Sequence, residues 1–403
     1  MQESVNSELL VSVDVGCYRH AVAIGLSDGG VLDEFEIDHD RDGFARFFDR
    51  ISRHEQTHGL PVSVAMEGYN GHARPLDRLV QARNYRLFNI NNLKLARFKE
   101  IFPAAAKTDA LDARKGLELF QLRRHLPMAK EVLQEVGPTP VVNEQLKRLT
   151  RRRRRMVNER GRVVNAMQSD LRTVCPGLLA MTKDVSQVWF INLLTSIKRN
   201  VRELAGKRAS SLLKVRGVGT VMLARIQSWQ KQACFSDEAE WVSAMILQDA
   251  RRIKELNEVI KALDMQIESL ATHSEQATLF RSVPGFGNIC SAELAGEIGT
   301  VERFAKEASL ALYLGMAPLD NASGTYHGSK TPRQVNRHAK AAMMTAVDRH
   351  RKCVPESQAY YEKKRLEGKA HNQAIRSLGR HLCRVLFRML EHDKPYEIRR
   401  PKA

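Results

Sequence analysis

The sequence predicts an α/β domain followed by two helical regions, and three observations support this fold class. The first third of the 403 residues alternates valine-rich strand patterns with helical patterns. The middle third holds two long polar helical stretches with few breakers, and the last third returns to shorter helices between glycine turns. We therefore expect domains at residues 1–132, 133–275 and 276–403.

The N-terminal region contains the strand signals. Residues 9–15 (LLVSVDV) have the pattern of a buried strand, and residues 20–37 form two strands joined at an Asp-Gly-Gly turn. The elements that follow are a helix at 42–54, a strand at 61–68, a helix at 73–84, a strand at 85–91 and a helix over 107–115. This order is compatible with a mixed sheet that carries helices on its faces.

The middle region is predicted to be helical and coiled-coil-like. Residues 144–176 form one long polar helix, which includes five consecutive arginines. A second helix covers residues 239–273, and its apolar residues recur every three or four positions, as in a coiled-coil seam. That seam consists of Ile253, Leu256, Ile260, Leu263 and Ile267. The two helices could pair as an antiparallel hairpin or dimerise.

The C-terminal region combines helices with turns. Residues 282–299 contain a glycine turn between helices, and residues 319–334 form a turn-rich loop without periodicity. Helices are expected before and after this loop, and a final amphipathic helix covers 372–392. The turns SVPGFG and KVRGVG resemble helix-hairpin-helix turns, whose helix N-terminus can accept a phosphate, although a purely structural turn fits them equally well.

The composition favours a nucleic-acid partner. Lys and Arg number 64 against 46 acids, so the net charge is +18. Aromatic residues make up only 6%, which argues against broad single-strand stacking platforms. The six cysteines show no CxxC spacing, so we expect a reducing cytoplasm. The sequence shows no secretory signal, and no segment is apolar over the length of a transmembrane helix.

Four acids are candidate metal ligands. Asp14 and Glu67 end two predicted strands, and Asp109 and Asp112 share one face of a helix, where their charges would repel. A divalent cation held by these carboxylates would explain the arrangement, as in phosphoryl transfer. Each acid alone is more typical of a surface group. The acidic run at 33–42 is a competing candidate, which we interpret as a solvated face.

Two basic segments are candidate phosphate-binding sites. The run Arg151, Arg152, Arg153, Arg154 and Arg155 covers every side of its helix, which favours phosphate binding over a solvated coiled-coil face. The loop after residue 320 carries a second set of cations.

That loop also offers a nucleophile. A serine beside several cations could attack a phosphodiester while the cations stabilise the developing charge, although a flexible polar loop is the simpler interpretation. The serine is Ser323, its rivals are Tyr326 and Ser329, and the cations are Lys330, Arg333, Arg337 and Lys340.

Taken in order, several motifs resemble the DEDD transposases of insertion sequences, in the one-ten group described as bridge-RNA-guided recombinases. In the N-terminal region they are VDVG, AMEGYNG and KTDALDARK. In the C-terminal region they are SVPGFGNICSAELAGEIG, ALYLGMAP and NASGTYHGSKTPRQVNRHAK. The resemblance covers nearly the whole chain, while the middle third is generic.

The resemblance implies an RNase-H-like (RuvC-like) domain whose four acids bind Mg²⁺, here Asp14, Glu67, Asp109 and Asp112. It also implies a C-terminal transposase domain with a serine nucleophile, here Ser323, because the first of the family's two serines is replaced by Ala322. The expected partners are donor and target DNA, a structured bridge RNA, and further copies of the chain in a dimer or tetramer. Such a protein would be cytoplasmic and associated with the nucleoid.

Three other functions stay open at this point. A site-specific DNA invertase of the same superfamily would use the same chemistry without RNA. A RuvC-like Holliday-junction nuclease would need the four acids but no serine. A non-enzymatic scaffold built on the basic helix would not cleave DNA.

Overall fold

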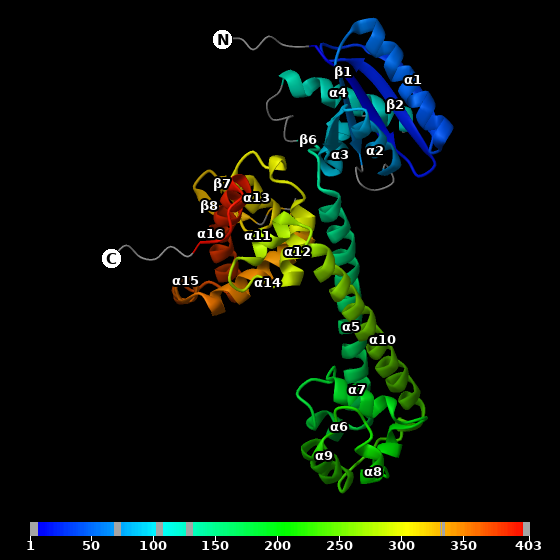
Figure 1. The fold of residues 1–403 in the computed structure, drawn as a ribbon, viewed down its shortest axis with the longest axis vertical. Helices are drawn as coiled ribbons and strands as arrows, with labels where there is room; N and C mark the ends of the chain where they lie inside the picture. The colour runs from blue at the N-terminus through cyan, green and yellow to red at the C-terminus, as the bar shows by residue number, and fades with distance from the viewer. Residues whose placement is uncertain are drawn as a thin grey trace. The chain divides into compact units, whose positions relative to one another are not determined.

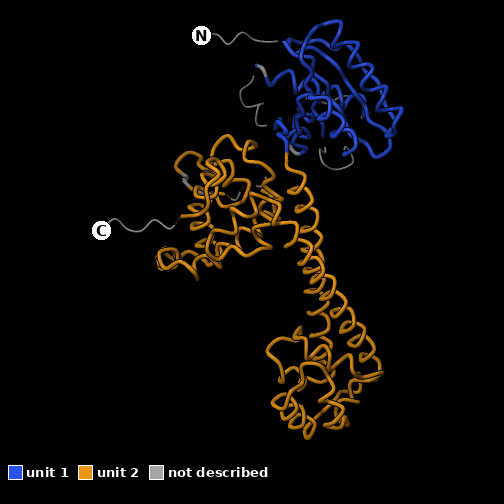
Figure 2. The backbone as a smooth tube through the Cα atoms, in the orientation of Figure 1, with its two compact units in different colours: residues 1–138 blue, residues 139–403 orange. Residues whose placement is uncertain are grey.

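The chain divides into two compact units, residues 1–138 and residues 139–403 (Figure 2). The structure is a computed structural model, and it describes residues 7–67, 74–101, 108–125, 132–330, 332 and 335–397. The first unit is a mixed α/β domain, and the second is almost entirely helical. The predicted combination of an α/β domain with a helical remainder is therefore confirmed at this level.

A six-stranded sheet organises the first unit (Figure 1). Its strands are β1 (Leu9–Val15), β2 (Arg19–Leu26), β3 (Val31–Asp38), β4 (Val62–Glu67), β5 (Arg86–Ile90) and β6 (Leu133–Glu135). The strand order is β3-β2-β1-β4-β5-β6. The pairs β1–β4 and β4–β5 are parallel, and the remaining neighbours are antiparallel. The helices are α1 (Arg41–His58), α2 (Arg74–Ala82), α3 (Asn92–Ile101) and α4 (Asp109–His125).

Side-chain alternation along β1 explains why helices cover both faces of the sheet. Leu9, Val11 and Val13 pack with residues of α1 and α2 on one face. Leu10 packs with residues of α3 and α4 on the other face. Because successive side chains of a strand point to opposite faces, Asp14 belongs to the α3–α4 side.

Two elements of this unit were not expected from the sequence. Helix α3 is short and mixed in polarity, so periodicity alone does not reveal it, and the Asn91 side chain begins it by accepting from the Lys94 amide at 3.1 Å. Strand β6 has three residues and depends on antiparallel pairing with β5. Both are set by tertiary packing rather than by local pattern.

Two long helices form the frame of the second unit. Helices α5 (Val141–Val174) and α10 (Ala239–Ala271) lie side by side and run antiparallel (Figure 1). The predicted apolar seam of α10, from Ile253 to Ile267, is buried. Of the two arrangements expected for these helices, the antiparallel hairpin is the one found within this chain.

Short helices connect α5 to α10 and build a separate apolar core with the adjoining ends of both. They are α6 (Pro176–Ala180), α7 (Val188–Thr195), η2 (Val201–Leu204), α8 (Ala209–Leu212) and α9 (Thr220–Gln230). Apart from the KVRGVG turn, the sequence does not indicate these elements, because the helices are too short to show periodicity.

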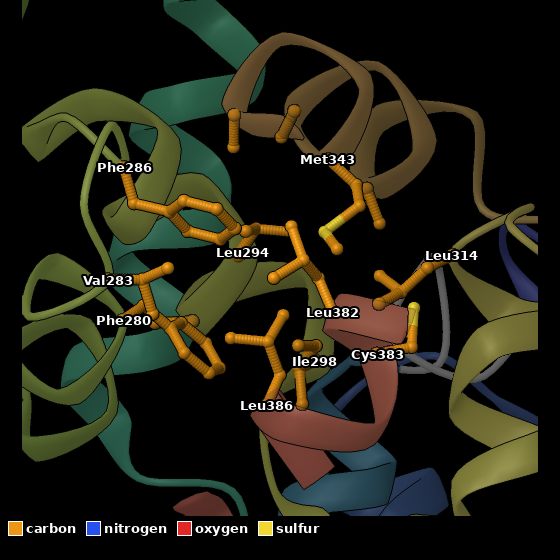
Figure 3. Close-up of a cluster of buried hydrophobic side chains, with 14 of the residues drawn as sticks. Phe280, Val283, Phe286, Leu294, Ile298, Leu314, Met343, Leu382, Cys383 and Leu386 are labelled. Atoms are coloured by element: carbon orange, nitrogen blue, oxygen red, sulfur yellow. The ribbon is translucent and has the colours of Figure 1, made fainter. Parts of the chain in front are cut away.

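The C-terminal helices enclose the largest buried cluster of this unit (Figure 3). They are α11 (Glu275–Arg281), α12 (Asn288–Ile298), η3 (Val301–Arg303), α13 (Glu307–Tyr313), α14 (Arg337–Cys353), α15 (Pro355–Leu366) and α16 (His371–His392). Phe280 and Phe286 pack with Leu294 of α12 and Leu386 of α16. Residues far apart in the sequence are therefore held in one core.

The glycine turns before α9 and α12 have the same geometry. Val218 and Phe286 each donate to a carbonyl three residues earlier, at 3.0 Å in both turns. Gly217 (φ +94°) and Gly285 (φ +85°) adopt left-handed conformations that favour glycine. Both turns pack closely on a neighbouring helix, so each glycine has a structural role in this fold.

The predicted loop after residue 318 is in fact a β-hairpin. Strands β7 (Leu319–Ser323) and β8 (Tyr326–Lys330) pair antiparallel, with Ser323 opposite Tyr326. The two-residue turn begins at Gly324 (φ +57°), where a type II′ hairpin turn requires glycine. The expectation of an irregular loop was wrong because a short polar hairpin lacks the apolar alternation of a buried strand.

The six cysteines are all free thiols, as their spacing predicted. Cys175 and Cys383 are buried, and Cys17, Cys234 and Cys353 are exposed. Among the described residues, no helix is both long and apolar enough to cross a membrane.

Candidate functional site

The sheet places Asp14 and Glu67 next to each other. Strands β1 and β4 are parallel neighbours, and Val13 pairs with Met66, so the next residues along the two strands are Asp14 and Glu67. Glu67 shares the face of Ala65, which packs with the α3–α4 residues. Both carboxylates therefore lie at the carboxyl end of adjacent strands, under the same helical layer.

Helix α4 brings the other two acids. Asp109 and Asp112 occupy its first turn, where carboxylates interact favourably with the helix dipole. One turn further on, Gly116 lies so close to β1 that an added Cβ would stand 2.3 Å from Ser12 Oγ. The absence of a side chain at Gly116 thus lets the start of α4 approach the strand that carries Asp14.

A lysine that the sequence patterns did not single out joins this group. Lys99 Nζ of α3 lies 3.2 Å from Asp112 Oδ2 and 3.7 Å from Glu67 Oε2. One ammonium group therefore bridges a strand-end acid and a helical acid. No spacing rule connects position 99 to the acids, because the contact exists only once α3 is folded.

The electrostatics of Asp14 show that the four acids share one environment. The pKa of Asp14 is raised to about 6, chiefly by burial; Lys99 opposes this increase, and the charges of Glu67, Asp112 and Asp109 add to it. Within the described part of the chain, no three His, Cys, Asp or Glu side chains are close enough to hold a metal ion. The donor chemistry still fits a hard divalent cation, because every candidate ligand is a carboxylate.

Gly116→Ala should destabilise the first unit by about 1–3 kcal/mol, because the new methyl group overlaps Ser12 Oγ in a packed layer. The double variant Ser12→Ala/Gly116→Ala removes the overlapping oxygen and should recover most of this loss. Chemical denaturation of both variants measures the effect. If the single variant is as stable as the wild type, α4 does not depend on this close approach.

The competing acidic run at 33–42 has structural partners. Asp33 pairs with Arg50 at 3.2 Å, Asp38 with Arg19 at 3.0 Å, and Asp40 caps α1 by accepting from the Gly43 amide at 2.7 Å. Each of these acids therefore has a partner within its own unit, and most lie at the surface. The interpretation as a solvated face agrees with these contacts.

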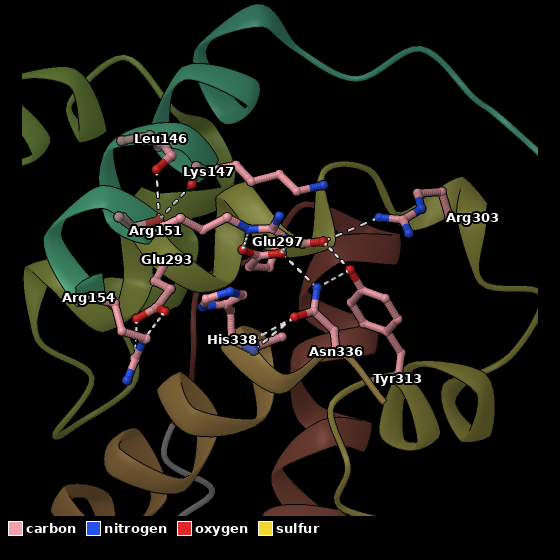
Figure 4. A network of polar contacts seen from close by, with 12 residues as sticks. Leu146, Lys147, Arg151, Arg154, Glu293, Glu297, Arg303, Tyr313, Asn336 and His338 are labelled. Carbon is pink, nitrogen blue, oxygen red and sulfur yellow. Dashed lines mark hydrogen bonds and ion pairs between the residues drawn. The ribbon is translucent and has the colours of Figure 1, made fainter. Parts of the chain in front are cut away.

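The arginine run is divided between two roles. Arg151 binds Glu297 at 2.6 and 2.8 Å, and Arg154 binds Glu293 at 2.7 and 2.5 Å (Figure 4). Arg153 pairs with Asp264 of α10. In the described residues Arg152 and Arg155 have no carboxylate partner, and both are exposed. Of the five arginines, Arg152 and Arg155 are therefore the ones left available to bind phosphate.

The Arg151–Glu297 pair also positions the start of α14. Burial would raise the pKa of Glu297, but Arg151 and Asn336 outweigh it and hold that pKa below its usual value. Asn336 donates to Glu297 and to the Tyr313 hydroxyl, both at 2.6 Å, and its side-chain oxygen caps α14 (Figure 4). The basic helix therefore fixes where α14 begins.

Arg151→Ala should destabilise the second unit by about 3–5 kcal/mol, because it leaves the fully buried Glu297 carboxylate without its cation. Arg152→Ala, the matched control one residue along, should change the free energy of unfolding by less than about 0.5 kcal/mol. Denaturant titration compares the two variants. Equal stabilities would show that the buried pair does not hold the C-terminal helices.

The predicted serine lies at the end of β7 and is exposed. No residue of the described chain forms a hydrogen bond with its hydroxyl. Lys330 and Arg337 are exposed, and Lys340 is half-buried with its stem against Gly315. Arg333 and the side chains of Tyr326 and Ser329 lie outside the described residues. Ser323 is thus accessible, but nothing described near it activates it.

Two sequence-family matches cover most of this architecture. A transposase model of the IS110 DEDD type matches residues 11–176, which contain the acids, and the transposase IS116/IS110/IS902 family matches residues 277–362, which contain the serine hairpin. The chain belongs to the IS110 family of DEDD transposases. The resemblance seen in the sequence motifs is confirmed, and the protein acts in the mobility of an insertion sequence.

Relatives of this IS110-family transposase are similar along most of their length. The 44.8 kDa protein of insertion element IS116 from Streptomyces clavuligerus is 25% identical over 396 residues, or 96% of each chain. The 42 kDa protein of IS900 from Mycobacterium paratuberculosis is 28% identical and covers 84% of this chain and 85% of its own. The 43.6 kDa protein of IS110 from Streptomyces coelicolor is 27% identical, and the match covers 77% of this chain and 76% of the relative.

Proposed function

We propose that this transposase cuts and rejoins DNA strands with a Mg²⁺-binding acid site and a serine nucleophile, guided by a bridge RNA. The observation that carries the proposal is the convergence of Asp14, Glu67 and Asp112 around Lys99 at the carboxyl end of an RNase-H-like sheet. DNA is the substrate, so the protein would act in the cytoplasm, at the nucleoid.

All four candidate ligands of the acid site are carboxylates, the ligand type expected of a metal site for phosphoryl transfer. Asp14, Glu67, Asp109 and Asp112 would hold the cation, and magnesium would polarise the phosphodiester and neutralise its developing charge. Asp14 is destabilised as an anion until a cation approaches. Lys99 lies between Glu67 and Asp112 and would have to release at least one of them for that carboxylate to bind a cation.

The serine belongs to the other compact unit and lacks an activating neighbour among the described residues. We infer that Ser323 becomes reactive in an oligomer, a dimer or tetramer, in which the acid site of one subunit serves the serine of another. Lys330, Arg333, Arg337 and Lys340 would bind phosphates near it, and Arg152 and Arg155 would bind the backbone of DNA or of the RNA.

The test is strand exchange between donor and target plasmids by purified protein with magnesium, with and without ribonuclease treatment. Loss of exchange after RNA removal, restored by RNA recovered from the protein, supports the guided recombinase. Exchange that survives complete RNA removal would favour the DNA invertase, which uses the same chemistry. Cleavage that leaves free ends would favour the junction nuclease, and binding without cleavage would favour the scaffold.

A further inference from the structure

A pocket of about 480 Å³ lies beside the serine hairpin, and none of its residues has an assigned role apart from Lys330. One face of α16 forms a wall, with side chains spaced three and four residues apart. These are Gln373, Arg376, Ser377, Arg380 and His381. Segment 315–318, which leads into β7, and Lys330, which ends β8, form the opposite side.

The walls of this pocket are held together by close packing. An added Cβ at Gly379 of α16 would lie 2.5 Å from Met316 Sδ, so this glycine lets segment 315–318 approach the helix. Met316 is 1% exposed. Because both walls belong to one packed layer, the pocket exists before any ligand binds.

The pocket carries an excess of positive charge. Arg380 is neutralised by Glu307, and Lys369 Nζ lies 3.8 Å from Glu367, which also pairs with Lys364. Arg376 and Lys330 have no carboxylate partner in the described residues. No acid lines the pocket in the part of the chain that the structure describes. Two cations that face a cavity without a counter-ion are suited to an anion.

An aromatic ring lines the same pocket. The Tyr360 hydroxyl lies 3.0 Å from His381 Nε2, which fixes the ring against the α16 wall. Burial and three nearby cations lower the pKa of His381, so its ring is neutral at physiological pH. A fixed aromatic ring beside unpaired cations is the combination that binds a nucleotide, with the base on the ring and the phosphate on the cations.

We propose that this pocket binds one nucleotide of the DNA strand on which Ser323 acts, with its phosphate at Arg376 and Lys330 and its base against Tyr360. Lys330 pairs with Leu319 at the base of the hairpin, four residues from Ser323. Extended strands rise about 3.4 Å per residue, so the pocket lies about 14 Å along the hairpin from the serine, a few nucleotides away. The assignment of the strand rests on the proposed function.

The test measures binding of a fluorescein-labelled single-stranded DNA hexanucleotide to the full-length protein by anisotropy, without magnesium. Arg376→Gln and Lys330→Gln should each weaken binding about tenfold, because a charge-assisted contact is lost. Arg388→Gln is the matched control, since Arg388 lies on the same helix, is exposed, has no carboxylate partner in the described residues and does not line the pocket. Its affinity should stay within about twofold.

The aromatic contribution is tested separately. Tyr360→Leu should weaken binding about fivefold or more, whereas Tyr360→Phe keeps the ring and should bind nearly as well. Thermal unfolding checks that each variant is folded. The proposal is wrong if Arg376→Gln and Lys330→Gln bind the DNA like Arg388→Gln, or if Tyr360→Leu and Tyr360→Phe bind it alike. Nucleotide binding in this pocket does not require a nucleophile. If Ser323→Ala still carried out strand exchange, the proposed function would be contradicted, but the binding results for the pocket would still hold.

Discussion

Asp14→Asn should abolish strand exchange, by about 10³-fold or more, and at the same time make the metal-free protein more stable at neutral pH. The loss of activity follows from removing one ligand of the proposed metal site. The gain in stability follows from the environment of Asp14, where burial and three neighbouring acids raise the pKa to about 6 from an ordinary 3.8. Asparagine has a similar shape but carries no charge to desolvate.

The sign of the pH dependence can be worked out from this pKa. Between about pH 4 and pH 6 the folded state keeps the Asp14 proton and the unfolded state loses it, so stability falls as the pH rises through this window. Above about pH 6, Asp14 is ionised in the folded state as well, and its destabilising effect on that state no longer changes with pH. Two pKa units correspond to about 3 kcal/mol, and partial exposure of the group reduces the expected gain for Asp14→Asn to about 1–2 kcal/mol.

Thermal unfolding at pH 5 and pH 7.5 without divalent cations measures this gain. Magnesium should then raise the unfolding temperature of the wild type and leave Asp14→Asn almost unchanged, because a ligand stabilises only the state that binds it. Asp28→Asn, an exposed acid in the β2–β3 turn, is the control and should respond to magnesium like the wild type. An equal magnesium response in Asp14→Asn would remove Asp14 from the metal site.

The N-terminal half of the candidate site could be predicted because its information is local. A valine-rich strand ending in an acid, and two acids three apart on a helix, are visible in the sequence at Asp14 and at Asp109 and Asp112. The sheet then aligns Asp14 with Glu67 through ordinary parallel pairing. The sequence could not show Lys99, because its role depends on how α3 packs over the strand ends.

The roles of the individual arginines in the run 151–155 could not be predicted from local sequence. Its density of charge indicates a polyanionic partner, but side-chain direction on α5 decides which arginines are available. Glu293 and Glu297 are almost completely buried on α12 and take up Arg154 and Arg151. These two acids lie some 140 residues from the arginine run in the sequence. Periodicity shows only that their helix is largely apolar, and it does not show that its acids pair with those arginines.

Ser323→Ala should keep nucleic-acid binding and reduce strand exchange by about 10³-fold or more, because the proposed nucleophile is gone. In the proposed step Ser323 Oγ forms a bond to phosphorus as the bond to the departing DNA oxygen breaks. The hydroxyl proton passes to a base and the leaving oxygen is protonated. One phosphoester replaces another, so the strand can be rejoined by the reverse reaction without an external energy source.

Two features of the hairpin leave Ser323 accessible. It is exposed at the end of β7, and Gly324 beside it turns the chain with a positive φ and no side chain, which leaves the hydroxyl open to a DNA strand. If Ser323 is the nucleophile, Tyr326→Phe and Ser329→Ala are expected to retain strand exchange. Both substitutions keep the hairpin backbone, so they are matched controls for Ser323→Ala.

The decisive measurement is the covalent intermediate itself. A serine hydroxyl is a weak nucleophile at neutral pH, and no described side chain binds that of Ser323, so an adduct should form only when magnesium and the assembled oligomer are present. The reaction is stopped with denaturant, and the modified peptide is identified by mass spectrometry. An adduct on Tyr326 would place the chemistry with tyrosine recombinases, and cleavage with no adduct would mean that an activated water attacks the phosphodiester. An adduct on Ser323 that disappears in Asp14→Asn would show that the acid site and the serine act in one reaction.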